Sequence, residues 1–375
     1  MHYLDNSATT QVLEEAAKCA AEVMTADYGN PSSLHTLGVN AKNILDSSRE
    51  EIAKKLHVQR DEIYFTSGGT EGNNLAIFGA VGAKRRLGNK VVTTAAEHPS
   101  VLKAVKELER FGIECVYVEP NSDGNIDEEK LYNAVDNKTI LVTAMLVNNE
   151  TGAVFPVKAA ANAIKRKKSP ALLHVDAVQA FGKMDFSPVK LGADLCTVSG
   201  HKMHAPKGIG ALYMQKGKRV LPQVFGGGQE KGLRPGTESM PLIAAFGEAA
   251  RQIPSYSQGF EHAQNLNNLL RSKLSKIDGV GINSPDNALP YILNFTAGRV
   301  KAETMLHFLA AREVYVSAGS ACGKARPSHV LEAMKLSKER IDSSLRVSFS
   351  RFNTEEDVFA LVNALNEGLN TLRHN

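Results

Sequence analysis

Short apolar runs alternate with segments of helical periodicity over the first two thirds of the chain. Short runs of this kind predict buried strands, and their alternation with helices is typical of a mainly parallel sheet that carries helices on both faces. We therefore predict an α/β fold with a seven-stranded central sheet. The predicted strands cover residues 62–66, 90–94, 113–118, 139–147, 171–176, 194–199 and 210–214.

The pattern changes after the glycine-rich stretch 225–239, where a long helical segment is expected at about 241–277. Short strands and helices follow it, and Thr354 to Asp357 has the form of a capping box that begins a last helix. The prediction is a large α/β domain and a smaller α+β domain. The large domain covers residues 15–255, and the small domain combines 1–14 with 256–375. Helices near 11–26 and 38–57 are expected to join the small domain or pack against it.

The composition is that of a globular protein. Of the 375 residues, 43% are hydrophobic, and no apolar run reaches the roughly 18 residues of a membrane-spanning helix. The N-terminal "MHYLDNSATT" has neither the basic nor the apolar region of a secretory signal, so we expect a cytoplasmic protein. A net charge of +4 is too small and too dispersed to predict nucleic-acid binding.

Four cysteines are scattered along the chain without a CxxC pair, which predicts neither disulfides nor a zinc site. Cys19 fits a helix, and Cys115 and Cys196 fit strands, so packing is the simplest interpretation of all three. Cys322 differs because it lies in "SAGSACGKARPSH", a run of small residues followed by basic ones. From this run alone, a structural thiol and a reactive one both stay open.

Reactive polar groups follow two of the predicted strands. Asp176 and Gln179 follow 171–176, while Ser199, His201 and Lys202 follow 194–199. A simple ion pair between Asp176 and Lys202 is one interpretation. The other is a pyridoxal phosphate site, which needs a lysine amine and a carboxylate that keeps the pyridine nitrogen protonated. Ligands of open α/β sheets bind beyond the carboxyl ends of the strands, where these residues are expected.

Three further stretches end strands in polar residues. "FTSGGTEGNN" predicts a strand, a glycine turn with Gly69 and Thr70, and a helix N-terminus that suits an anion. From this stretch alone, a turn without a ligand is the better interpretation. His98 stands before Pro99 at the expected start of a helix and could stack on a planar cofactor or simply satisfy a hydrogen bond. Asn149 lies in "VNNETG", which on its own is a polar turn.

Taken together, the motifs resemble those of the cysteine desulfurases, and the resemblance runs nearly from end to end. In chain order they are "YLDNSATT", "YGNPSSLH", "SGGTEGNN", "EHPSV", "VNNETG", "HVDAVQA", "SGHKMHAPKGIGALY", "GGGQEKGLRPGTES", "GSACG" and "LRVSFSRFNTEEDV". The resemblance implies a fold-type I, class V aminotransferase-like enzyme with pyridoxal 5'-phosphate as cofactor.

The resemblance also implies a role for each matching residue. Lys202 becomes the Schiff-base lysine, Asp176 the partner of the pyridinium nitrogen, and Gln179 the donor to the phenolic oxygen. His98 becomes the stacking residue and an acid/base group. The phosphate would be bound by the "SGGT" turn with Gly69 and by Thr70, Ser199 and His201. Thr237 would reach the same phosphate from the second subunit of a homodimer. Asn149 would lie beside both the cofactor and the substrate, and Arg346 would bind the substrate carboxylate through its matching planar fork.

The implied reaction converts L-cysteine to L-alanine and leaves a persulfide on Cys322. The sulfur would pass to an acceptor, either an iron-sulfur scaffold protein or a tRNA-thiolating enzyme, with no direct binding of nucleic acid or membrane. If Cys322 were structural, the same fold could serve a class V aminotransferase or a selenocysteine lyase. An alternative that is not an enzyme is a scaffold protein without catalytic activity, which binds a partner and uses the cofactor only for stability.

Overall fold

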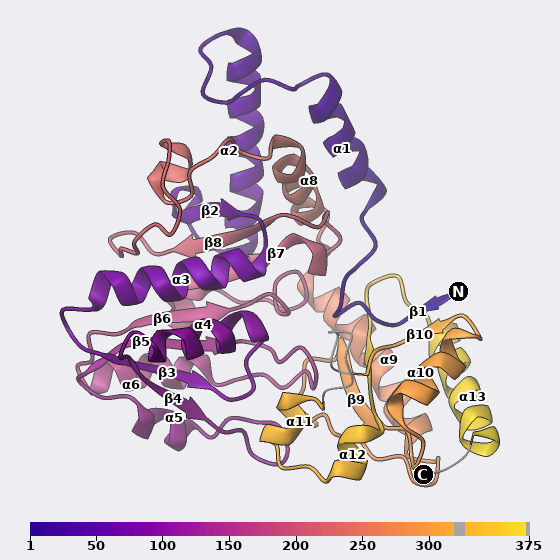
Figure 1. Cartoon of the computed structure of the whole chain (residues 1–375). Helices are drawn as coiled ribbons and strands as arrows, with labels where there is room; N and C mark the ends of the chain where they lie inside the picture. Colours follow the sequence, from indigo (N-terminus) through magenta and orange to yellow (C-terminus); the bar gives the residue numbers. More distant parts are fainter. Residues whose placement is uncertain (319–326, 373–375) are drawn as a thin grey trace.

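Seven strands form the central sheet of the computed structural model, which describes residues 1–318 and 327–372 (Figure 1). Every neighbouring pair is parallel except the two pairs that include β8. The predicted α/β class and the seven strands are confirmed, with bounds that differ by two residues at most. In spatial order the strands are β2 (Ile63–Thr66), β8 (Gly210–Met214), β7 (Leu195–Ser199), β6 (Leu172–Asp176), β5 (Thr139–Met145), β3 (Lys90–Thr94) and β4 (Glu114–Val118).

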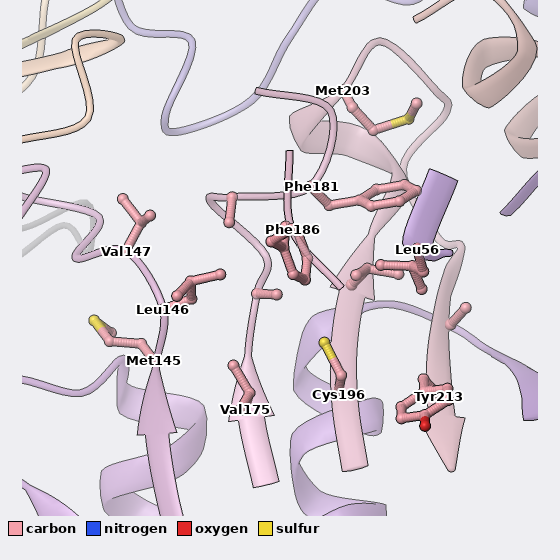
Figure 2. Packing of buried hydrophobic residues seen from close by; sticks show 14 of the residues in the cluster. Leu56, Met145, Leu146, Val147, Val175, Phe181, Phe186, Cys196, Met203 and Tyr213 are labelled. Atoms are coloured by element: carbon pink, nitrogen blue, oxygen red, sulfur yellow. The ribbon is translucent and has the colours of Figure 1, made fainter. Parts of the chain in front are cut away.

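Both faces of this sheet are buried, which explains the nearly continuous apolar runs in its strands. Successive side chains enter different hydrophobic clusters: Leu195 and Leu212 belong to one, and their neighbours Cys196 and Tyr213 belong to the other. Figure 2 shows part of the second cluster, which contains Cys196 and Tyr213. The cluster that contains Leu195 and Leu212 also includes buried side chains of α3 (Gly69–Lys84) and α4 (Pro99–Glu109).

Helices α1 (Glu14–Thr25) and α2 (Thr36–Leu56) pack on α8 (Met240–Arg251). Their buried side chains belong to the same hydrophobic cluster as Cys196 and Tyr213, so these helices are part of the core of the large sheet rather than of the small domain. The helix expected over 241–277 is in fact two helices, α8 and α9 (Tyr256–Leu274). Pro254 lies in the break, where its ring and missing N–H prevent a continuous helix.

A second, smaller core is formed mainly by the C-terminal part of the chain. There β9 (Ile292–Thr296) pairs antiparallel with β11 (Ser344–Ser348), and β1 (His2–Tyr3) pairs parallel with β10 (Val314–Tyr315). This core has its own hydrophobic cluster, filled from α9, α10 (Ala302–Ala310) and α13 (Glu355–Thr371). The capping box predicted at Thr354 is confirmed, whereas the exact domain bounds stay a prediction.

The remaining helices are short and connect these layers. They are α5 (Glu128–Ala134), α6 (Val157–Arg166), α7 (Pro188–Leu191), α11 (His329–Ala333), α12 (Lys338–Asp342) and the 3-10 turns η1 (Arg60–Glu62), η2 (Gly200–Lys202) and η3 (Gln229–Gly232). Across residues 1–318 and 327–372, the helices include none with the length and apolar character needed to cross a membrane.

The N-terminal segment connects the small core to the end of the large sheet. After β1, Leu4 donates its N–H to the carbonyl of Tyr315, and Thr10 donates its N–H to the carbonyl of His201 at 3.0 Å. Residues 5–10 therefore run past the carboxyl end of β7. This position brings the backbone of the first ten residues next to the polar strand ends.

Candidate active site

The polar residues predicted at strand ends meet at one edge of the sheet. Strands β3, β5, β6 and β7 are mutually parallel, so their carboxyl ends share that edge. Asp176 is the last residue of β6, and Ser199 is the last residue of β7. His98 and Asn149 lie in the turns that follow β3 and β5. This is the position at which ligands bind in open α/β sheets.

The Asp176 carboxylate is buried and held by neutral donors. It accepts hydrogen bonds from the Asn73 side-chain amide at 2.7 Å and from the Val178 backbone N–H at 3.0 Å. Lys202 does not bond to it, because the Lys202 ammonium donates to the carbonyls of Ser7 and Ala8 at 2.5 and 2.7 Å. The simple ion pair that the sequence left open is therefore absent, and the carboxylate stays available for a cationic ligand group.

Lys202 lies on the turn η2, directly after β7. Burial, reinforced by the positive charge of Arg346, lowers the pKa of its amine to about 8, although Asp5 and Asp176 oppose this change. An amine with this pKa is partly neutral near physiological pH. Since only the neutral form is a nucleophile or a base, Lys202 has the properties that amine chemistry requires.

This lowered pKa predicts an unusual pH dependence for chemical modification of the cofactor-free protein. At pH 8, about half of the Lys202 amines are neutral, against less than about 1% for a lysine with an ordinary pKa near 10.4. Acylation by a small reagent should therefore be half-maximal near pH 8 at Lys202, and above about pH 10 at the amine of an unstructured lysine peptide added as a reference. Peptide mass spectrometry measures both sites in one sample, and equal pH profiles would contradict the assignment.

His98 caps α4, as predicted from its place before Pro99. Its Nδ1 accepts the backbone N–H of Ser100 at 3.1 Å, so a neutral ring carries its proton on Nε2. Burial lowers the pKa of His98, and the charges of Lys202 and His329 act in the same direction while Asp176 opposes them. The residue nevertheless remains exposed to solvent. A neutral, accessible imidazole thus stands beside Asp176 and Lys202.

The turn between β2 and α3 has the features of an anion cradle. Gly68 has a φ of +147°, which glycine adopts far more easily than other residues, and α3 begins at Gly69. A Cβ on Gly69 would lie 2.8 Å from Val178 Cγ2, so no larger residue fits without movement. The Ser199 hydroxyl next to it is buried and finds no hydrogen-bond partner within the described chain. Buried hydroxyls are normally bonded, which indicates space for a polar ligand.

The other predicted phosphate-binding residues differ in their surroundings. Thr70 and Thr237 are exposed, Thr70 on the first turn of α3 and Thr237 in the loop before α8. His201 is partly buried, with Nδ1 3.3 Å from the Thr9 hydroxyl. Burial and the neighbouring Lys202 lower the pKa of His201 to about 4, so its ring is neutral at physiological pH.

Arg346 lies on β11 and is 2% exposed. Its guanidinium donates to the Asp5 carboxylate at 2.8 Å and to the Asn149 carbonyl at 3.0 Å. The Arg346 Nε and the Asn149 side-chain oxygen are both buried, and neither has a partner among residues 1–318 and 327–372. Unsatisfied buried polar atoms on both residues are consistent with a polar substrate between them.

Sequence reasoning missed the groups that hold these residues in place. They are Asp5, which pairs with Arg346; the Ser7 and Ala8 carbonyls, which accept from Lys202; Asn73, which bonds Asp176; and Lys183, which bonds Gln179. Asp5, Ser7 and Asn73 stand in motifs quoted above. The motifs therefore indicated the region of the site, but the contacts between these residues become visible only in the folded structure.

Cys322 lies outside the described residues. After it, the Ser328 hydroxyl donates to the buried Glu150 carboxylate, and His329 Nε2 lies 2.8 Å from the Glu97 carbonyl. Each of the three described cysteines has a thiol pKa raised by burial, to about 11 for Cys115. A raised pKa reduces the thiolate fraction, so Cys19, Cys115 and Cys196 are poor nucleophiles.

Known proteins resemble this chain over almost its whole length. The model of the family "Aminotransferase class-V" matches residues 2–361. A cysteine desulfurase of Nostoc sp. is 39% identical over 376 aligned residues, which cover 99% of this chain and 93% of the relative.

Solved structures agree. A NifS-like protein superposes with a TM-score of 0.93 at 35% identity, covering 99% of both chains. A structure described as SspA in complex with cysteine superposes with a TM-score of 0.84 at 32% identity, covering 94% of this chain and all of that one. These likenesses confirm the predicted fold-type I architecture and the expected relationship to cysteine desulfurases. The chain therefore belongs to the class V aminotransferase family of pyridoxal phosphate-dependent enzymes, among the cysteine desulfurases.

Proposed function

We propose that this enzyme binds pyridoxal 5'-phosphate at the sheet edge and moves the sulfur of L-cysteine to Cys322, with L-alanine as the other product. The observation that carries the proposal is the convergence of Lys202, Asp176 and Arg346 at the carboxyl ends of the strands. Around them, several buried polar atoms have no partner within the described residues. This is the donor set that a charged, planar cofactor and an amino acid require.

The residues present fit this cofactor. The phosphate would lie at the α3 N-terminus, where Gly69, Thr70 and the unsatisfied Ser199 hydroxyl offer donors, with His201 adjacent. Asp176 would hold the ring nitrogen, Gln179 the phenolic oxygen, and His98 would stack on the ring. When bound, the cofactor supplies an electron sink for the substrate's α-carbon. A homodimer whose Thr237 completes the phosphate site is part of the proposal, and the exposure of Thr237 is compatible with it.

The chain's own groups would bind and deprotonate the substrate. Arg346 offers its fork to the substrate carboxylate, and the free Asn149 side-chain oxygen lies beside it. The Lys202 amine, partly neutral near pH 8, can take a proton from the substrate and return it to the product. The Nε2–H of His98 is a second proton donor at the same edge.

Cys322 would then receive the sulfur. Its thiolate attacks the substrate sulfur, the bond between that sulfur and the β-carbon breaks, and the electron pair of this bond returns to the carbon skeleton, which is protonated to alanine. The raised thiol pKa values of the other three cysteines support this choice. The persulfide would be passed to an iron-sulfur scaffold protein or a tRNA-thiolating enzyme. Assays of alanine and sulfide release from cysteine, compared with selenocysteine, test the proposal against a selenocysteine lyase.

Substitution of Arg346 should separate binding from chemistry. Arg346→Lys keeps the charge but loses the planar fork, so we expect KM for cysteine to rise about 10- to 100-fold with a smaller change in kcat, as for loss of one charge-assisted hydrogen bond. Arg271→Lys is the matched control, because Arg271 lies in a different part of the molecule, on α9. Steady-state kinetics measure both constants, and an unchanged KM would contradict the role of Arg346.

A further inference from the structure

Lys183 is a buried amine without a carboxylate partner. Its side chain lies in the turn after β6, is only 5% exposed, and forms no ion pair with the acidic residues of the described chain. Burial of an unpaired ammonium is costly, so a lysine at such a position is unusual unless it is neutral or has a specific task. Burial, followed by the positive charges of Lys202 and Arg346, lowers the pKa of Lys183 to about 7.

Among residues 1–318 and 327–372, the Lys183 amine has one hydrogen bond, to the side chain of Gln179. Its Nζ donates to Gln179 Oε1 at 3.0 Å, and on the other side of the amide Gln179 Nε2 donates to the Ser7 carbonyl at 3.0 Å. A backbone carbonyl only accepts, and the Lys183 amine is the donor in its contact with Gln179. The two neighbours therefore impose the same orientation on the amide, with its N–H directed away from Lys183.

The Ser7 carbonyl extends this chain of contacts to the reactive amine. Besides Gln179, it accepts from Lys202 at 2.5 Å. A small cavity of about 30 Å³, large enough for one water molecule, is lined by both Lys183 and Lys202. The hydrogen bonds of the described residues thus connect Lys183 to Lys202 through Gln179 and Ser7.

We propose that Lys183 is a positioning residue of the reaction, which fixes the Gln179 amide so that its N–H faces the phenolic oxygen of the cofactor and the Ser7 carbonyl that holds Lys202. This inference rests on the proposed function, because it assigns Gln179 to that oxygen. Lys202 and Arg346 are the cations that act on Lys183, and Asp5 and Asp176 are the acids that act on neighbouring Lys202. Lys183 itself has no contact with substrate or cofactor in this arrangement.

The test uses the holoenzyme and the pH at which the visible absorbance of its bound cofactor changes. An N–H that donates to the phenolic oxygen favours its negative form, so loss of that donor should raise the midpoint by about one pH unit. Lys183→Met removes the amine but keeps the length of the side chain, and we expect this rise. Gln179→Leu should give the same rise, and the double variant no more than either single one, because both changes break one chain of contacts. Lys183→Arg restores a donor and should return the midpoint toward the wild-type value.

A wild-type midpoint in Lys183→Met, or a double variant whose rise is the sum of the two single rises, would overturn the proposal. Crystal structures of the cofactor-free wild type and Lys183→Met give an independent reading. We expect Gln179 to lose its bond to Ser7 or change rotamer in the variant, whereas an unmoved Gln179 amide would also overturn the role of Lys183. If the wild-type protein shows no cofactor band, the proposed function fails instead, and the Gln179 comparison still decides whether Lys183 orients the amide.

Discussion

Lys202→Ala is expected to lower kcat/KM for cysteine by about 10⁴-fold or more, because the variant loses both the amine that anchors the cofactor and the base that moves the substrate proton. The fold should survive. The change removes a half-buried amine whose pKa is already lowered to about 8. It takes one donor from the Ala8 carbonyl and one from the Ser7 carbonyl, which still accepts from Gln179. Activity assays and thermal unfolding of the same preparation separate these two effects.

Lys207→Ala is the control for this substitution. Lys207 follows Lys202 in the same loop but is exposed, and its removal should leave both kcat/KM and the cofactor spectrum unchanged. In Lys202→Ala, reduction with borohydride should no longer attach the cofactor to the protein. A variant that still fixes the cofactor covalently at another lysine, or retains a tenth of the wild-type rate, would contradict the role given to Lys202.

Cys322→Ala is expected to abolish sulfur transfer to an acceptor, with loss of at least about 10³-fold, since a nucleophile cannot be replaced by a methyl group. Cofactor binding should be unaffected because none of the proposed cofactor contacts involves Cys322. Cleavage of selenocysteine should be less affected if selenium can leave without attack by a thiolate. The rate of alanine formation from the two substrates measures this difference.

Cys115→Ala is the matched control, since burial raises the pKa of that thiol to about 11 and its sulfur contacts the carbonyl of Val105. We expect this variant to keep full desulfuration. Full activity of Cys322→Ala with a physiological acceptor would show that another group receives the sulfur.

The strands and caps were predictable because their causes are local. Two faces of buried sheet require apolar runs, and the turns that end them in Asp176 and Ser199 are contiguous with those runs. His98 and Thr354 cap helices through contacts within three residues, which a sequence displays directly. Pro254 is a local signal for the break between α8 and α9, but the apolar periodicity on both sides of it favours one continuous helix.

The supporting contacts of the site were not predictable in the same way. Asp5 and Arg346 are 341 residues apart, and Ser7 and Lys202 are 195 residues apart. No local pattern indicates which carbonyl or carboxylate will face a given cation across such distances. Lys183 illustrates the same limit. Its neighbours in the sequence do not distinguish it from a surface lysine, and its burial is seen only in the folded structure.

The most direct test of the central claim is the location of sulfur after one turnover. The holoenzyme is incubated with L-cysteine without acceptor or reductant, then digested, and the masses of its four cysteine peptides are measured. We expect one additional sulfur atom on the peptide with Cys322, alanine formed in equal amount, and neither product in Lys202→Ala. Sulfur on the peptide of Cys19, Cys115 or Cys196, or alanine without any sulfur on Cys322, would contradict it.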